Sequence, residues 1–157
     1  MDLNSQLKPF VWNVTYNDPQ RWQEVYAISG ARMAGLKGVS ETLRGRAIGS
    51  PVVQLTGCHG LDVFQNLIQT QANRMSLNFM RTKDGIIGFC KVRLEVYAIP
   101  IRHGEWTLEM EPSGGTQPGE TIILTCTRKG QRVHWQVSGP PEVIRRFTSW
   151  LEMAKRS

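Results

Sequence analysis

The chain has 157 residues, of which 40% are hydrophobic and 20% are charged. This composition excludes an intrinsically disordered chain, and the length suits a single folded domain over residues 1–157. Lys and Arg number 19 against 13 Asp and Glu, and the net charge of +6 favours partners that carry negative charge, such as nucleic acid or an anionic membrane surface.

The cysteines and the first residues of the chain indicate in which cellular compartment the protein is expected. Cys58, Cys90 and Cys126 are an odd number at wide spacing, which argues against a disulfide framework and is typical of a reducing compartment. The first residues contain no basic stretch followed by an apolar stretch, and no apolar run approaches the length that spans a bilayer. We therefore expect a soluble intracellular protein, in the cytoplasm.

The first third of the chain predicts a strand, a helix and a loop. Residues 9–16 (PFVWNVTY) alternate as a strand does, and Asp18-Pro19 supplies an N-cap and a first-turn proline for a helix over about 19–29. Residues 30–50 contain five glycines and four cations against one Glu, which predicts a Gly-rich basic connection. The alternative is a basic arm that closes on a polyanion.

The middle of the chain predicts a strand, a long helix and two further strands. Residues 51–56 are a short buried strand, and residues 60–80 place apolar side chains on one helical stripe with a polar, nearly uncharged opposite face. That face either meets water or contacts another chain. Residues 88–99 (GFCKVRLEVYAI) and 105–111 (EWTLEME) alternate as half-buried antiparallel strands.

The last third predicts a hairpin and a helix. With Lys129-Gly130 as a two-residue turn, the apolar pairs on one face of the hairpin are Cys126 with Val133, Leu124 with Trp135, and Ile122 with Val137. Pro140-Pro141 ends the hairpin and begins an amphipathic helix whose apolar stripe is Val143, Phe147, Trp150, Leu151 and Ala154.

The element order is therefore β-α-β-α-β-β-β-β-α. It predicts an α+β fold in which an antiparallel sheet of about five to six strands carries its helices on one face. Five tryptophans are distributed along these elements, and they either fill the core or line a cavity between the sheet and the helices.

Residues with catalytic or metal-binding chemistry are few. Cys58-His59 precedes the predicted helix at 60–80, where the helix dipole would lower the pKa of a thiol, so a Cys58-based activity is one alternative. Adjacent side chains point apart, however, and no third residue is available to orient the pair. Metal-ligand spacings such as CxxC or HExxH are also lacking in the sequence. We therefore predict a protein without enzymatic activity, metal or cofactor.

The basic side chains are the strongest functional signal. Arginine dominates among them, which suits bidentate contacts to phosphate. The predicted polyanion-binding residues are Arg44, Arg46, Arg128, Lys129, Arg132, Arg145 and Arg146.

These residues predict a non-enzymatic binding or assembly protein for RNA, DNA or an anionic membrane surface. Residues 104–127 carry four Glu and no Lys or Arg, whereas residues 128–157 are basic, so copies of the chain are expected to associate as a homo-oligomer of matrix type. The alternative is a ligand- or partner-binding α+β module with a pocket between the sheet and the helices.

Overall fold

The fold is known from a computed structural model, which describes residues 3–33, 47–70, 75–110 and 120–156. Within these ranges the helices are α1 (Leu3–Leu7), α2 (Pro19–Ser29), α4 (Asp62–Gln69) and α5 (Pro141–Arg156). The strands are β1 (Trp12–Asn13), β2 (Val53–His59), β3 (Met75–Arg81), β4 (Gly85–Val92), β5 (Glu95–Arg102), β6 (Trp106–Met110), β7 (Glu120–Arg128) and β8 (Gln131–Gly139).

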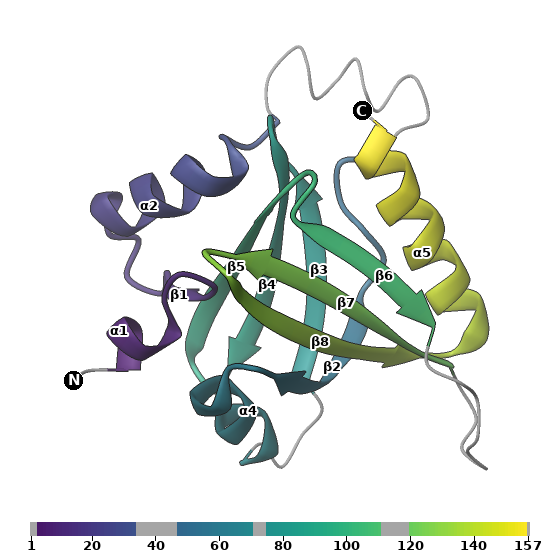
Figure 1. Cartoon of the computed structure of the whole chain (residues 1–157), viewed down its shortest axis with the longest axis horizontal. Coiled ribbons are helices and arrows are strands. Elements are labelled where there is room, and N and C mark those ends of the chain that lie inside the picture. The colour runs from purple at the N-terminus through teal and green to yellow at the C-terminus, as the bar shows by residue number, and fades with distance from the viewer. Residues whose placement is uncertain (1–2, 34–46, 71–74, 111–119, 157) are drawn as a thin grey trace.

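The eight strands form one antiparallel sheet in the order β1-β5-β4-β3-β2-β8-β7-β6. Figure 1 shows that the sheet is strongly curved, so that β6, β7 and β8 cross in front of β3, β4 and β5. The α+β class and the antiparallel sheet confirm the prediction, and the sheet has more strands than the five to six expected.

The main core lies between the two halves of the curved sheet. Phe64 of α4 packs edge-on against Tyr97 of β5 and Trp135 of β8, with ring centroids 5.9 and 5.6 Å apart. Phe79 of β3 and Phe147 of α5 meet with centroids 5.9 Å apart. Helices α4 and α5 thus close the space that the curved sheet leaves open, and burying these large aromatic side chains supplies much of the driving force for folding.

Helix α2 lies outside the curved sheet, so the prediction that the helices share one face is wrong for this helix. Val25 of α2 packs with Trp12, Ile87 and Ala98 in a second, smaller buried cluster. Along β4 the side chain of Ile86 belongs to the main core, whereas its neighbour Ile87 faces α2. Both faces of β4 are therefore buried, and α2 and α5 lie on opposite sides of the sheet in Figure 1.

The single helix predicted over 60–80 is wrong. Helix α4 ends at Gln69, and Met75–Arg81 is strand β3, with Met75, Leu77 and Phe79 buried. A spacing of four residues, as between Met75 and Phe79, satisfies both the helical period of 3.6 and the strand period of 2. Leu77 midway between them satisfies only the strand period.

The single strand predicted over 88–99 is also wrong, because the chain reverses at Arg93-Leu94. Val92 pairs with Glu95 across this turn, and Cys90 pairs with Tyr97. Unbroken alternation over 88–99 predicts Tyr97 on the same face as Lys91 and Arg93, but the reversal places it on the inner face, where it is 1% exposed. Arg93 has a φ of 58°, a conformation usually adopted by Gly or Asn. Because neither residue stands at 93 or 94, the composition of this segment did not predict a turn.

The hairpin of β7 and β8 confirms the predicted register. Cys126 pairs with Val133, and Leu124 pairs with Trp135. Lys129 and Gly130 form the turn with φ values of 50° and 77°, as a turn of the I′ class requires. Its pairing was predictable because a slip of one residue would expose the apolar face.

The N-terminal region differs in part from the prediction. Of the strand predicted over 9–16, only Trp12–Asn13 pairs in the sheet, and helix α1 was not expected. Helix α2 confirms the predicted bounds, and its N-cap is Asp18, whose carboxylate accepts a hydrogen bond from the Gln20 amide at 2.9 Å.

Asp18→Ala is expected to lower the free energy of unfolding by about 1 kcal/mol, because it removes the cap of α2. Urea denaturation of the two proteins measures the difference. Asp18→Asn serves as the control, since its side-chain oxygen can still accept the Gln20 hydrogen bond. Equal losses for both variants would show that charge rather than capping is responsible.

Candidate anion-binding groove

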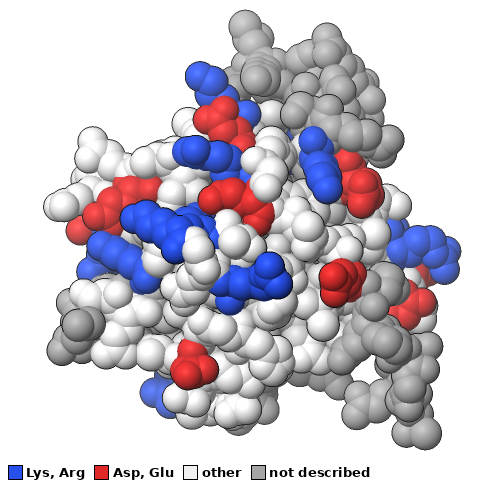
Figure 2. Space-filling model, in the orientation of Figure 1, with Lys and Arg blue, Asp and Glu red and all other residues white. Residues whose placement is uncertain are grey.

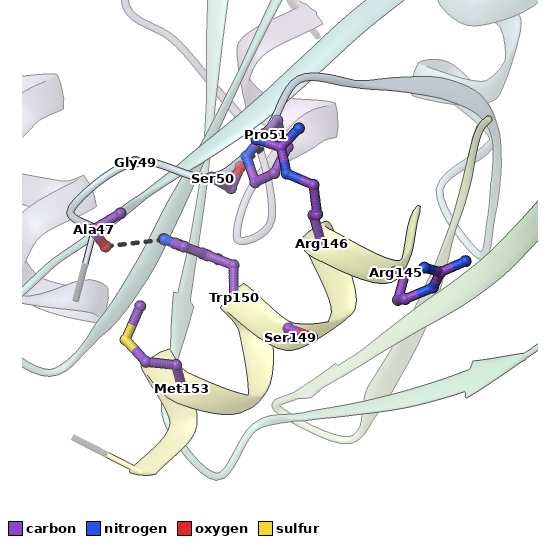
Figure 3. A pocket seen from close by; sticks show the side chains of 9 residues that line it. All are labelled: Ala47, Gly49, Ser50, Pro51, Arg145, Arg146, Ser149, Trp150 and Met153. Atoms are coloured by element: carbon purple, nitrogen blue, oxygen red, sulfur yellow. Dashed lines mark hydrogen bonds between the residues drawn. The ribbon is translucent and has the colours of Figure 1, made fainter. Parts of the chain in front are cut away.

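An open groove runs between α5 and residues 47–51, with a volume of about 550 Å³. We call it the basic groove. Its lining is shown in Figure 3 and comprises Ala47, Gly49, Ser50, Pro51, Arg145, Arg146, Ser149, Trp150 and Met153. These residues include two arginines and no carboxylate, so the electrostatic potential of the groove favours anions.

One wall of the groove is held by β3. The Ser50 amide donates to the Phe79 carbonyl at 2.8 Å, and the Arg81 amide donates to the Ile48 carbonyl at 2.8 Å. The Ser50 hydroxyl accepts from the Phe79 amide at 2.8 Å. Residues 48–50 therefore continue the line of β2 along β3, and their backbone is fixed by the sheet.

The other wall is α5, whose orientation follows from its apolar stripe. Ile144, Phe147 and Leu151 are buried in the main core, which leaves Arg145 and Arg146 exposed. Trp150, 5% exposed, donates from its indole nitrogen to the Ala47 carbonyl at 3.0 Å. This hydrogen bond, drawn in Figure 3, fastens the helix to the opposite wall.

The two arginines are available to a ligand. The side chain of Arg146 points across the groove toward Ser50 and Pro51, while Arg145 leaves α5 in another direction (Figure 3). Among the described residues neither guanidinium has an ion-pair or hydrogen-bond partner. Each therefore retains the full set of donors that a guanidinium presents to a phosphate.

The other predicted basic residues do not join this groove. Lys129 and Arg132 are exposed at the tip of the β7–β8 hairpin, whereas α5 begins after the other end of β8, and a nine-residue strand is about 30 Å long. Arg44 and Arg46, with most of the predicted connection over 30–50, lie outside the described residues. On the face shown in Figure 2, Lys and Arg alternate with Asp and Glu and form no continuous basic patch.

The predicted surface position of Arg128 is wrong. Its side chain is 7% exposed and donates to Glu105 at 3.1 and 3.2 Å, to the Pro100 carbonyl at 2.9 Å and to the Pro9 carbonyl. Burial by itself would raise the pKa of Glu105, but the hydrogen bonds and charge of Arg128 outweigh it and hold that pKa below its usual value. Arg128 therefore has a structural role, joining the hairpin tip to β5 and to the N-terminal segment.

Cys58 lacks the features of an activated nucleophile. It lies in β2 with 1% exposure, and burial, with a smaller effect from Asp62, raises the pKa of its thiol to about 12. The adjacent His59 is exposed, so the two side chains point apart as adjacent strand residues do. Burial therefore raises the pKa of this thiol above its usual value, opposite to the lowering that the Cys58 alternative expected.

All three thiols are expected to resist alkylation in the folded protein. Cys58, Cys90 and Cys126 are buried, and burial raises the pKa of Cys90 to about 12 and that of Cys126 to about 11. Thiolate is the reacting form, so iodoacetamide at pH 8 should label none of them while it fully labels free cysteine. Mass spectrometry before and after denaturation measures this, and rapid labelling of folded Cys58 would contradict it.

No metal centre is assembled by the part of the chain described here, in which no three His, Cys, Asp or Glu side chains come together. The same part contains no helix that is both long and apolar enough to cross a membrane. Comparison of the chain with protein-family models, curated proteins and solved structures gives no match.

The sequence identified one wall of the groove and missed the other. Arg145 and Arg146 were predicted from charge and helical period. Residues 47–51 carry no charge; 47–50 end the predicted Gly-rich connection and Pro51 begins the predicted strand, so charge did not mark them as part of a site. Their pairing with β3 and the hydrogen bond from Trp150 to the Ala47 carbonyl place them beside α5.

Proposed function

We propose that the protein is a non-enzymatic binding protein that holds the phosphate groups of a nucleic acid strand in the basic groove. The observation that carries the proposal is the pair of exposed arginines, Arg145 and Arg146, in a groove whose lining, among the residues that the structure describes, contains no carboxylate. Their planar guanidinium groups suit bidentate hydrogen bonding to phosphate.

The shape of the basic groove favours an extended strand as its ligand over a membrane surface. A groove of about 550 Å³ admits the backbone of an extended strand, whereas a membrane surface meets protruding parts of a protein. The fixed backbone of residues 48–50 and the Trp150 anchor keep the two walls in place, so little ordering is needed on binding.

The groove supports contacts to phosphate more than contacts to bases. Trp150 is 5% exposed and its indole nitrogen is bonded to Ala47, so it presents little ring surface for stacking. Phosphate contacts carry no sequence information. We therefore propose binding that depends weakly on nucleotide sequence and strongly on salt.

The test is fluorescence anisotropy of a labelled single-stranded RNA titrated with the full chain at low and at physiological salt. The proposal requires binding at low salt that weakens steeply as salt rises, with similar affinities for RNAs of unrelated sequence. Absence of binding at low salt would reject it. Strong preference for one sequence would reject the phosphate-based form of recognition.

The alternative function, a ligand pocket lined by tryptophans, has less support. Trp12, Trp106, Trp135 and Trp150 are between 1% and 5% exposed, and Trp135 packs against Phe64. These side chains fill the core in the way that structural aromatics do. A shift of tryptophan fluorescence on adding an apolar ligand would restore this alternative.

A further inference from the structure

Two exposed apolar side chains stand at one end of the sheet, away from the basic groove. Leu94 is 85% exposed and Tyr16 is 79% exposed, while most other large apolar side chains that the structure describes are buried. Leu94 is at the turn between β4 and β5, and Tyr16 is in the turn that follows β1. Turns usually hold small polar residues at such positions.

Two hydrogen bonds, one between backbone groups and one to a side-chain hydroxyl, place these two turns beside each other. The Val14 amide donates to the Val96 carbonyl at 2.9 Å, and the Val96 amide donates to the Thr15 hydroxyl at 2.8 Å. Tyr16 is the next residue after Thr15, and Leu94 is two residues before Val96. We call Tyr16 and Leu94, with the turn residue Arg93, the apolar tip.

The backbone conformation of Arg93 makes this turn less stable than the same turn with a glycine. Arg93 has a φ of 58° without being glycine, a backbone conformation that costs free energy for a side chain with a Cβ. The turn therefore combines a strained arginine with a leucine that buries almost nothing in the fold. A two-residue hairpin turn calls for a positive φ at its first residue, which Gly, Asn or Asp usually supplies, so Arg93 followed by an exposed Leu94 is an unusual choice for this turn.

The charges around the apolar tip favour an anionic surface. Lys91 and Arg93 are exposed beside Leu94. Two carboxylates lie close in the sequence, and each is directed to a partner of its own: Glu95 accepts a hydrogen bond from the buried Tyr97 hydroxyl at 2.9 Å, and Asp18 caps α2 and lies 3.8 Å from the Arg21 guanidinium. An apolar protrusion flanked by cations matches the membrane interface, where acyl chains lie beneath anionic headgroups.

We propose that the apolar tip binds anionic lipid membranes, with Leu94 entering the acyl region and Tyr16 lying at headgroup level. Lys91 and Arg93 then contact the lipid phosphates. Tyrosine prefers this interface because its ring is apolar and its hydroxyl is polar. This site is separate from the basic groove, and the inference does not depend on nucleic acid binding.

The test is flotation of the full chain with vesicles of phosphatidylcholine, with and without phosphatidylserine. We expect binding to the vesicles that contain phosphatidylserine and a reduction of roughly tenfold in the partition coefficient for Leu94→Ser. Leu94 is 85% exposed, so this variant removes little packing. Val52→Ser is the matched control, since Val52 is 57% exposed elsewhere, and it should bind as the unaltered protein does.

A second variant separates folding from binding. Arg93→Gly relieves the positive φ and removes one cation, so it should leave the melting temperature unchanged or higher while membrane binding falls about fivefold. RNA affinity should stay unchanged in Leu94→Ser.

The proposal is overturned if the chain ignores vesicles with phosphatidylserine or if Leu94→Ser and Val52→Ser bind alike. It is also overturned if Leu94→Ser changes the mass of the protein in solution without lipid, because the apolar tip would then bind a second copy.

Discussion

Replacing Arg128 with alanine is expected to lower the free energy of unfolding by about 3 kcal/mol, the lower end of the range for breaking a buried ion pair. The variant leaves Glu105 partly buried without its cation and removes donors from the carbonyls of Pro9 and Pro100. Urea denaturation followed by tryptophan fluorescence measures the loss. Arg128 connects three segments, so the loss should appear in the single cooperative transition of the domain.

The matched control for Arg128→Ala is Lys129→Asn, which removes a positive charge from the next residue along the chain. Lys129 is exposed with a φ of 50°, a conformation that asparagine tolerates, so its effect should stay within about 0.5 kcal/mol. Equal losses for the two variants would mean that the ion pair contributes little. A binding experiment on the hairpin tip must therefore change Lys129 and Arg132 and leave Arg128 intact.

The position of Arg128 could have been predicted from the register that the sequence itself specified. Residues 122, 124 and 126 form the apolar face of the hairpin, and residue 128 continues that alternation onto the inner face. The positive charge and the nearness of the turn suggested exposure instead. What the sequence could not supply is the partner, because Glu105 lies 23 positions earlier and reaches Arg128 through the pairing of β6 with β7, where the Thr127 amide donates to the Glu105 carbonyl at 2.9 Å.

Local signals predicted the elements whose pattern admits one interpretation. The hairpin of β7 and β8, helix α2 and helix α5 each have a clear period together with a cap, a turn or a proline that sets their ends. The errors over 60–80 and 88–99 fall where one pattern satisfies two structures. In 60–80, the four-residue spacing of Met75 and Phe79 fits a helix and a strand alike. In 88–99, the alternation of apolar and polar residues continues without a break through the turn at Arg93-Leu94.

The basic groove depends on long-range pairing, which explains why half of it was missed. Its arginines come from α5, and its other wall comes from residues about 100 positions earlier, joined by the Trp150 bond to Ala47. Charge and helical period are local properties and identified Arg145 and Arg146. The groove itself arises only when residues 48–50 pair with β3.

The double substitution Arg145→Gln with Arg146→Gln is expected to weaken RNA binding by at least about tenfold at low salt, because it removes two phosphate contacts. Both side chains are exposed, so the free energy of unfolding should remain within about 0.5 kcal/mol of the unaltered value. The salt dependence gives the sharper measurement. Each phosphate contact to a single strand contributes about 0.7 to the slope of log K against log salt, so the slope should fall by about 1.4.

The matched control for the groove is Lys129→Asn with Arg132→Gln, which also removes two positive charges. Both doubly substituted proteins carry a net charge of +4, from +6 less 2, so a general effect of charge would weaken them equally. The proposed site requires the larger loss and the smaller slope in the α5 variant, since its arginines line a groove whereas Lys129 and Arg132 stand on an open turn. The opposite ranking would move the nucleic acid site to the hairpin tip, and equal losses would leave net charge as the only determinant of binding.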